Sequence, residues 1–188
     1  ALAVANGHHW AARIPEYPGH FDGAQIHSHQ YRTPFEPVDC IGKRVLVVGM
    51  GNSAMDIASE LSQRPMAEKL FVSTRRGVWI FPKYYRGQPL DKNPAPAWLP
   101  KGIKQWLGAR MVKGLVGKMS DYGLPEPEIG PFESHGTVSG EFLVRAGSGD
   151  INMKPAVERL DGDGVVFTDG SREQVDAMVP GEVVVYQT

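Results

Sequence analysis

The feature that most constrains the fold of this chain is a strand, turn and helix pattern at residues 44–61. Residues 44–48 (Arg-Val-Leu-Val-Val) form a short apolar run rich in β-branched residues, which predicts a buried parallel strand. Apolar side chains then recur at helical spacing over residues 52–61, and Pro65 prevents the helix from continuing far beyond them. Residues 69–74 predict a second strand. Together these elements predict a right-handed βαβ unit.

The remaining sequence places further elements around this unit. Eight of the 15 prolines lie between residues 82 and 131, which predicts an irregular, partly helical insertion at about 82–135. Short strands and Asp-Gly turns follow it, with strands expected at 151–154, 156–160, 164–168 and 177–179. We therefore expect an α/β fold: a Rossmann-like dinucleotide-binding domain with a parallel central sheet, a small antiparallel β element and the Pro-rich insertion.

The predicted division of the chain has three parts. Residues 1–40 are rich in histidine, glycine and proline and are expected to form a linker or hinge segment. Residues 41–179 are expected to form the dinucleotide-binding domain, and residues 180–188 an irregular tail. The chain begins at Ala1 inside an apolar run, without a methionine, so we expect it to be a piece of something longer.

The glycine turn at residues 49–54 (Gly-Met-Gly-Asn-Ser-Ala) indicates a phosphate site. It follows a predicted strand and opens a predicted helix, which is the context that gives this motif its meaning. Gly49 allows the tight turn, Gly51 lets the backbone approach a pyrophosphate, and the small Ala54 lets the helix pack closely. The helix N-terminus offers unpaired N–H groups to the phosphates. The alternative is a tight turn that binds nothing.

The end of the second strand indicates which dinucleotide is bound. Residues 73–77 read Ser-Thr-Arg-Arg-Gly, without the acid that usually holds the ribose hydroxyls of NAD. Guanidinium groups suit a 2′-phosphate, so we expect NADP(H) rather than NAD(H), unless both arginines are merely solvated. The expected cofactor-binding residues are Gly49, Gly51, Asn52, Ser53, Ala54, Ser73, Arg75 and Arg76.

Residues 21–32 (Phe-Asp-Gly-Ala-Gln-Ile-His-Ser-His-Gln-Tyr-Arg) carry a family resemblance. This segment resembles the F-x-G-x-x-x-H-x-x-x-[YF]-[KR] signature of flavin-containing monooxygenases, and the turn at residues 49–54 follows it as in that family. The run at residues 7–10 and the turn at residues 169–171 are also similar. The related Baeyer–Villiger monooxygenases carry Trp followed by Pro or Asp where this chain has Tyr31-Arg32.

The resemblance implies a flavoprotein that uses FAD, NADPH and O₂ to oxygenate a nitrogen or sulfur atom of a small-molecule substrate. It gives His27 a tentative catalytic role, with a structural hydrogen bond in the linker as the alternative. Family members begin with a separate FAD-binding glycine motif, and none precedes Ala1. Ala5-Asn6-Gly7 replaces an A-T-G crossing, and residues 179–182 lack the A-T-G-Y-like return. The resemblance thus implies an NADP-binding domain whose partner is the FAD domain of the same enzyme.

Other function classes fit less well. The alternatives are a catalytically inactive NADP-binding module and a Baeyer–Villiger-type ketone monooxygenase. A disulfide reductase needs a cysteine pair, and Cys40 is the only cysteine. We expect no metal site, because the histidines of residues 8–29 lack an accompanying carboxylate or cysteine cluster.

Charge and hydropathy limit the partners and the location. A net charge of −1 provides no field for nucleic acid. No run of about 18 apolar residues exists, and no secretory signal precedes the domain, so a cytoplasmic location is expected. Residues 101–119 are basic, with apolar residues at roughly helical spacing, and we expect them to pack over the core rather than contact a membrane.

Overall fold

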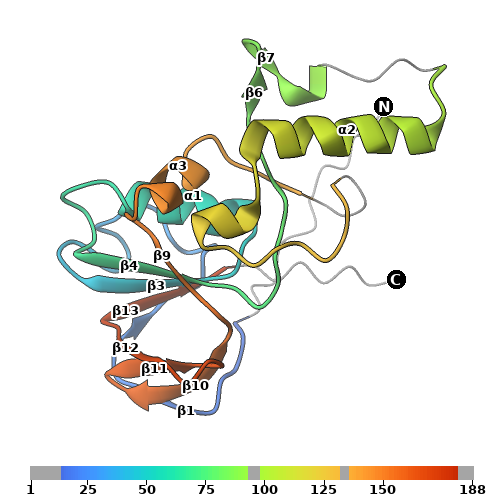
Figure 1. The fold of residues 1–188 in the computed structure, drawn as a ribbon. Helices are drawn as coiled ribbons and strands as arrows, with labels where there is room; N and C mark the ends of the chain where they lie inside the picture. The colour runs from blue at the N-terminus through green and yellow to red at the C-terminus, as the bar shows by residue number, and fades with distance from the viewer. Residues whose placement is uncertain (1–13, 93–97, 132–135, 182–188) are drawn as a thin grey trace, which may run out of the picture.

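A five-stranded parallel sheet lies at the centre of the computed structural model, which describes residues 14–92, 98–131 and 136–181 (Figure 1). The predicted βαβ unit is confirmed as strand β3 (Arg44–Val48), helix α1 (Asn52–Leu61) and strand β4 (Lys69–Ser73). The two strands pair in parallel. The local apolar pattern of the sequence was therefore sufficient to predict the middle of the sheet.

Three further strands complete this sheet from distant parts of the chain. The strand order is β2-β13-β3-β4-β9, and every neighbouring pair is parallel. The added strands are β2 (Ala24–Gln25), β9 (Asn152–Lys154) and β13 (Ala177–Pro180). Strand β13 was predicted to end at residue 179, and Pro180 extends it by one residue.

A second sheet has the order β1-β10-β11-β12. Its strands are β1 (Gly19–Phe21), β10 (Val157–Gly162), β11 (Gly164–Phe167) and β12 (Arg172–Gln174). The pairs β10–β11 and β11–β12 are antiparallel, as expected for the small β element. The expectation was incomplete, because β1 joins this sheet in parallel to β10.

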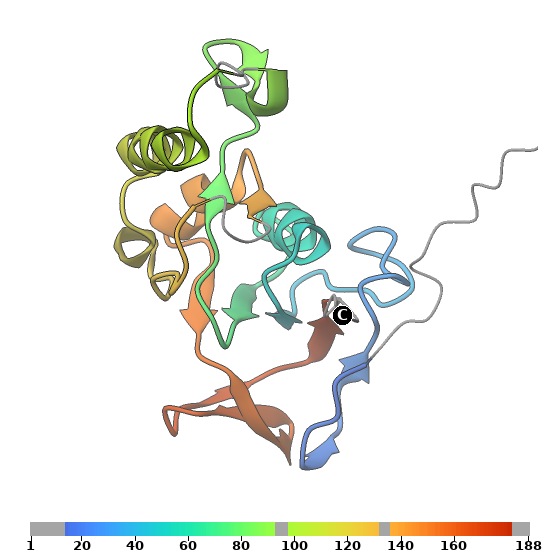
Figure 2. The same cartoon turned by 90° about the vertical axis from the view of Figure 1, so that its right-hand side faces the viewer.

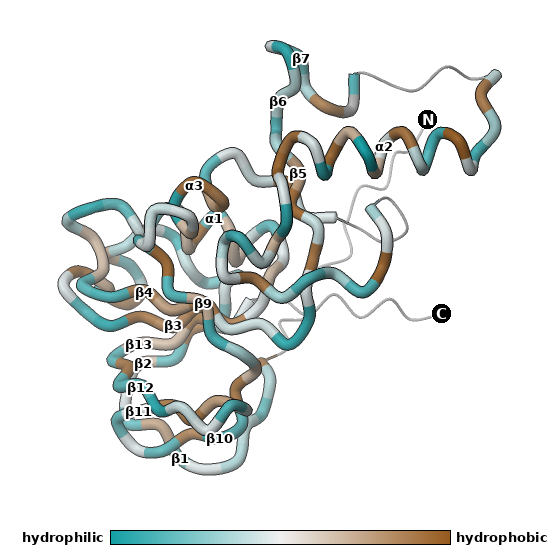
Figure 3. The backbone as a smooth tube through the Cα atoms, in the orientation of Figure 1, coloured by the Kyte–Doolittle hydropathy of each residue, from teal (hydrophilic) through white to brown (hydrophobic). Residues whose placement is uncertain are grey.

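The central sheet separates two apolar clusters. Val45 and Val47 face the cluster that includes α1 and the short helix α3 (Phe142–Gly147), whereas Leu46 belongs to the cluster shared with the second sheet. Side chains of a strand alternate between the two faces, so the continuous apolar run of β3 serves both clusters. Figures 1 and 2 show this arrangement of helices, central sheet and second sheet. Figure 3 shows that hydrophobic residues are concentrated at β3 and β4.

The Pro-rich insertion leaves and re-enters the fold through a two-stranded parallel sheet. Strand β5 (Ile80–Phe81) pairs with β8 (Thr137–Val138). The segment between them contains β6 (Tyr84–Tyr85), β7 (Gln88–Pro89), helix α2 (Lys101–Val116) and 3₁₀ turns at Leu90–Lys92 and Met119–Tyr122. The partly helical character of the insertion is thereby confirmed, and α2 projects beyond the sheets in Figure 1.

Of two expectations about helices, one was wrong and the other is confirmed only in part. Helix α3 lies where only strands were expected, because its six residues are too few to show a helical period. Helix α2 packs on the core only through its C-terminal half: Val112 and Val116 are buried, whereas Ile103 and Trp106 are exposed. The three glycines at residues 102, 108 and 114 did not prevent the helix, and Gly117 ends it as the C-cap.

The expected linker segment takes part in both sheets through β1 and β2. The division into residues 1–40, 41–179 and 180–188 stays a prediction. The patterns at residues 5–10 and most of the predicted tail, residues 182–188, lie outside the described residues.

An ion pair joins the first residue of β3, Arg44, to Asp176, the residue before β13. The Asp176 carboxylate accepts hydrogen bonds from the Arg44 backbone N–H at 2.8 Å, from Nε at 2.9 Å and from an Nη at 2.6 Å. The Asp176 backbone also pairs with Arg44 and with Ala24 of β2. The Arg44 hydrogen bonds lower the pKa of Asp176 to about 2. Asp176 thus connects three neighbouring strands at one edge of the sheet.

Replacing Asp176 with Asn is expected to lower the free energy of unfolding by about 1 kcal/mol at pH 7, because this partly exposed pair is screened by solvent. The native pKa lies below that of an unfolded aspartate, so the stabilisation is complete above about pH 4 and is lost as the pH falls toward about 2. Urea denaturation across this pH range tests the prediction. The control is Asp22→Asn, at the exposed His20–Asp22 pair. A difference in unfolding free energy between the wild type and Asp176→Asn that did not change with pH would contradict the prediction.

Candidate functional site

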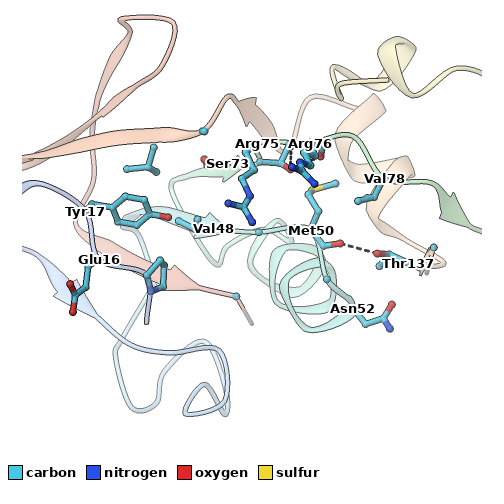
Figure 4. A pocket seen from close by; sticks show the side chains of 18 residues that line it. Glu16, Tyr17, Val48, Met50, Asn52, Ser73, Arg75, Arg76, Val78 and Thr137 are labelled. Atoms are coloured by element: carbon cyan, nitrogen blue, oxygen red, sulfur yellow. Dashed lines mark hydrogen bonds between the residues drawn. The ribbon is translucent and has the colours of Figure 1, made fainter. Parts of the chain in front are cut away.

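A pocket of about 700 Å³ lies where the parallel strands β3 and β4 end (Figure 4). The turn after β3, the end of β4 and the segment before β1 supply most of its wall. Residues after β9 and β13 complete it. Crevices at the carboxyl ends of parallel strands are the usual ligand sites of open α/β sheets.

The glycine turn forms one wall of this pocket with an open helix N-terminus. Gly49 has φ +112°, a conformation that L side chains rarely adopt, and its N–H donates to the Ser73 carbonyl at 2.9 Å. Gly51 is the N-cap of α1, so no side chain caps the helix, and the first turn contains no acidic residue. The positive end of the helix dipole therefore faces the pocket without a protein anion.

The backbone after β13 passes very close to this turn. The Gly181 N–H donates to the Val48 carbonyl at 2.5 Å. A Cβ at Gly181 would lie 2.8 Å from that oxygen and 3.1 Å from the Cβ of Ala54, which is buried. The small residue at position 54 therefore allows this close approach, as the motif predicts.

Strand β8, where the insertion ends, is hydrogen-bonded to the glycine turn. The Thr137 hydroxyl donates to the Met50 carbonyl at 2.8 Å, and the Val138 N–H donates to the Asn52 Oδ1 at 3.0 Å. Figure 4 shows the Asn52 side chain directed away from Arg75 and Tyr17. No local sequence pattern predicts this contact, because residues 137 and 138 lie outside any motif. Asn52 thus fixes the turn through its side chain, and Ser53 is exposed and outside the pocket lining.

Arg75 and Arg76 follow β4 and line the pocket with exposed side chains. Neither guanidinium makes a hydrogen bond or an ion pair within the part of the chain that the structure describes. Ser73 also lines the pocket, but its hydroxyl donates to the Pro155 carbonyl at 2.6 Å. The two arginines are therefore available for an anion, whereas Ser73 is already used in joining β4 to the segment after β9.

Tyr17 lines the pocket opposite Arg75 and was not identified from the sequence. Burial raises its pKa, and the nearby Arg75 guanidinium partly opposes this effect. Figure 4 shows the Tyr17 hydroxyl directed toward Arg75 and the Glu16 carboxylate directed away from it. Its one sequence signal is a position two residues before Gly19, outside the βαβ unit that carries the dinucleotide motif.

His27 lies outside the lining of this pocket, in the turn after β2. Its side chain is 1% exposed, and its Nδ1 accepts a hydrogen bond from the His29 N–H at 3.1 Å. An Nδ1 that accepts carries no proton, so neutral His27 is protonated on Nε2. The buried Nε2 has no hydrogen-bond partner among the described residues. The structure therefore gives His27 a local structural hydrogen bond and one unused donor, while its catalytic role stays a prediction.

Comparison with known proteins identifies the family. The family model described as flavin-binding monooxygenase-like matches residues 1–186. The chain belongs to this family. It is 36% identical over 192 residues to rat dimethylaniline monooxygenase [N-oxide-forming] 2, covering 95% of this chain and 35% of that protein. Human flavin-containing monooxygenase 3 is 33% identical with the same coverage. The chain thus spans about a third of the length of these relatives.

Solved structures support the same fold for this flavin-binding monooxygenase-like chain. Cyclohexanone monooxygenase from Rhodococcus sp. Phi1, bound to NADP⁺, is similar with a TM-score of 0.68 at 15% identity, over 91% of this chain and 44% of that one. A flavin monooxygenase mutant from Stenotrophomonas maltophilia has a TM-score of 0.52 at 22% identity, over 92% and 39% of the two chains. The predicted family and fold class are confirmed.

Two kinds of feature are absent from the described residues. No helix among them is both long and apolar enough to cross a membrane. They also contain no group of three or more His, Cys, Asp or Glu side chains that could hold a metal ion.

The protonation of His27 can be tested with two substitutions. His27→Asn keeps an acceptor near the position of Nδ1, whereas His27→Gln places its amide farther out. We expect His27→Gln to lower the free energy of unfolding by about 1 kcal/mol more than His27→Asn, because it leaves the His29 N–H unpaired. Thermal denaturation measures the difference, and ¹H–¹⁵N spectra of the wild-type rings should show Nε2 protonated. A neutral His27 protonated on Nδ1 would contradict the arrangement.

Proposed function

We propose that this chain binds NADP(H) in the pocket between the glycine turn and Arg75, as the NADP-binding part of a flavin-dependent monooxygenase. The observation that carries the proposal is that Arg75 and Arg76, whose guanidinium groups have no partner among the described residues, lie beside an uncapped helix N-terminus. Both features favour anions, and they lie at the two places where a dinucleotide carries phosphate.

The glycine turn suits the pyrophosphate. The helix begins at Gly51 without a capping side chain, so its first N–H groups can donate to phosphate oxygens. Because the Asn52 side chain is bound to β8, the backbone rather than this side chain would hold the phosphates. The contacts of Met50 and Asn52 with β8 keep the turn in place before the ligand arrives.

The end of β4 suits an adenosine 2′-phosphate. Arg75 and Arg76 are the residues that follow the strand, at the position where NAD-binding domains place an acid. Their guanidinium groups can donate paired hydrogen bonds to phosphate oxygens. Glu16 is the one acidic side chain lining this pocket among the described residues, and it points away from Arg75.

The bound nicotinamide would supply a hydride to the FAD of the complete enzyme, which activates O₂ for transfer to a substrate. The residues of this chain would bind and orient the dinucleotide and exclude water around it. The proposed substrate is a small molecule with a nucleophilic nitrogen or sulfur, because the rat relative is named N-oxide-forming. Tyr31, whose hydroxyl donates to Glu60 at 3.0 Å, stands where Baeyer–Villiger enzymes are expected to carry tryptophan.

A Baeyer–Villiger activity is the second candidate, favoured by the fold similarity to cyclohexanone monooxygenase. Product analysis on the complete enzyme separates the two, using an amine, a sulfide and a cyclic ketone as substrates. The proposed activity predicts N- or S-oxides as the main products. Lactone as the main product would favour the second candidate instead.

Removing either arginine is expected to weaken NADPH binding. Arg75→Ala and Arg76→Ala should each raise the Kd for NADPH about tenfold, because each removes a charge-assisted hydrogen bond to phosphate. The Kd for NADH should change less than about twofold, since NADH lacks the 2′-phosphate. Fluorescence titration of the purified chain measures both constants.

Arg86→Ala is the matched control, because Arg86 lies on the β6–β7 hairpin outside the pocket lining and its loss should leave both constants unchanged. Equal wild-type affinities for NADPH and NADH, unaffected by Arg75→Ala or Arg76→Ala, would refute the assignment of NADP(H).

A visible absorption spectrum of the purified chain reports bound FAD, and NADPH oxidation after reconstitution separates an enzyme part from an inactive module. We expect the purified chain to bind NADPH without stoichiometric FAD, since the described pocket provides one dinucleotide site. If the chain is part of an enzyme, combining it with the FAD-binding domain of that enzyme should support NADPH oxidation. A chain that binds NADPH but never supports flavin reduction would favour the module.

A further inference from the structure

Tyr17 reaches the pocket from outside the βαβ unit. Its side chain packs against the apolar cluster that joins the central sheet to the second sheet, a cluster that includes Val157 and Phe167. Its hydroxyl is directed toward the pocket (Figure 4). The ring is therefore held by the core, while its polar end is available to a ligand.

The backbone of β1 fixes the position of Tyr17. The Leu160 N–H donates to the Pro18 carbonyl at 2.8 Å, and Gly19 pairs with Leu160 in the sheet. Gly19 has φ +100°, and a Cβ there would lie 2.1 Å from the Leu160 carbonyl oxygen. Only glycine permits this contact. The Pro18-Gly19 backbone therefore lies against β10, and this places the preceding residue, Tyr17, at the pocket.

Tyr17 and Arg75 each present an unused hydrogen-bond donor to the same space. Neither side chain makes a hydrogen bond or an ion pair within the described ranges 14–92, 98–131 and 136–181. The Glu16 carboxylate points away, so it does not provide an acceptor between them. A guanidinium and a phenol that face one another across a pocket suit an anion with several acceptor oxygens.

We propose that Tyr17 is a specificity-determining residue, whose hydroxyl donates a hydrogen bond to the 2′-phosphate of NADP(H) opposite Arg75. This inference rests on the proposed function and adds to it a residue from the segment that precedes β1. A 2′-phosphate has three terminal oxygens, enough for a guanidinium fork and a phenol together. The 2′-hydroxyl of NAD(H) carries no charge to attract them.

The protonation state of Tyr17 agrees with a donor. Burial raises its pKa above the ordinary tyrosine value, so the phenol keeps its proton at neutral pH. The charge of Arg75 acts in the opposite direction and is the weaker of the two effects.

Tyr17→Phe tests the hydroxyl while keeping the ring that packs in the core. We expect the Kd for NADPH and for adenosine 2′,5′-bisphosphate to rise about tenfold, the effect of one hydrogen bond to a charged group. The Kd for NADH should change less than about twofold. Isothermal titration of the full chain measures all three, and the bisphosphate limits the effect to the adenosine end.

Two comparisons make the result specific. Arg86→Ala, on the β6–β7 hairpin outside the pocket lining, is the control, and its ratio of NADPH to NADH affinity should equal that of the wild type. Combining Tyr17→Phe with Arg75→Ala should cost less than the two single changes added together, because both contact one phosphate.

The outcomes separate this inference from the proposed function. A wild-type chain that does not prefer NADPH over NADH refutes the proposed function itself. A wild-type preference that Arg75→Ala abolishes and Tyr17→Phe leaves intact overturns the role of Tyr17 alone. Equal losses for NADPH and NADH in Tyr17→Phe, with unchanged thermal stability, would also overturn it, since they would indicate general packing against the nucleotide.

Discussion

The turn between β3 and α1 depends on a backbone conformation that glycine supplies. Gly49 has φ +112°, and this reversal lets the chain leave the sheet and begin a helix at once. Because Gly51 then serves as the N-cap, the helix starts at the edge of the pocket with its N–H groups uncovered. The same turn accepts the backbone of Gly181 from the neighbouring strand at close range. A bulkier turn would move the helix away from the sheet and would remove both the packing and the anion site.

The second constraint is that the central sheet is apolar on both faces. The alternation of Val45 and Leu46 between two clusters means that helices cover one face and a second sheet covers the other. The second sheet therefore has a role in the site as well as in the core. It holds β1 through the Pro18–Leu160 contact, and β1 in turn places Tyr17 at the pocket. The packing of the second sheet against the central sheet therefore also determines which side chain lines this part of the pocket.

The sequence predicted those parts whose causes are local. The strand, turn and helix at residues 44–61 lie in one short segment, where periodicity and two glycines are sufficient signals. The hydrogen bond from Thr137 to the Met50 carbonyl joins residues 87 positions apart, and no short sequence pattern predicts such a contact. Tyr17 was missed for the same reason, because its relation to Arg75 exists only after β1 has paired with β10. In the candidate site, the backbone cradle could be predicted and the side chains that enclose it from distant segments could not.

The arginines of the chain show that the position of a guanidinium group, rather than its charge alone, indicates an anion site. Arg44 and Arg172 have aspartate partners, and they serve the strands that they join. Arg64, on the surface, has no hydrogen-bond or ion-pair partner among the described residues and lies outside the pocket lining, so an unpaired guanidinium alone indicates only solvation. Arg75 differs because it combines an open charge with a pocket, an uncapped helix N-terminus and a phenol that faces it. A net charge of −1 for the whole chain conceals this local excess of positive charge, which is the physical basis of the proposed preference for a phosphorylated ribose.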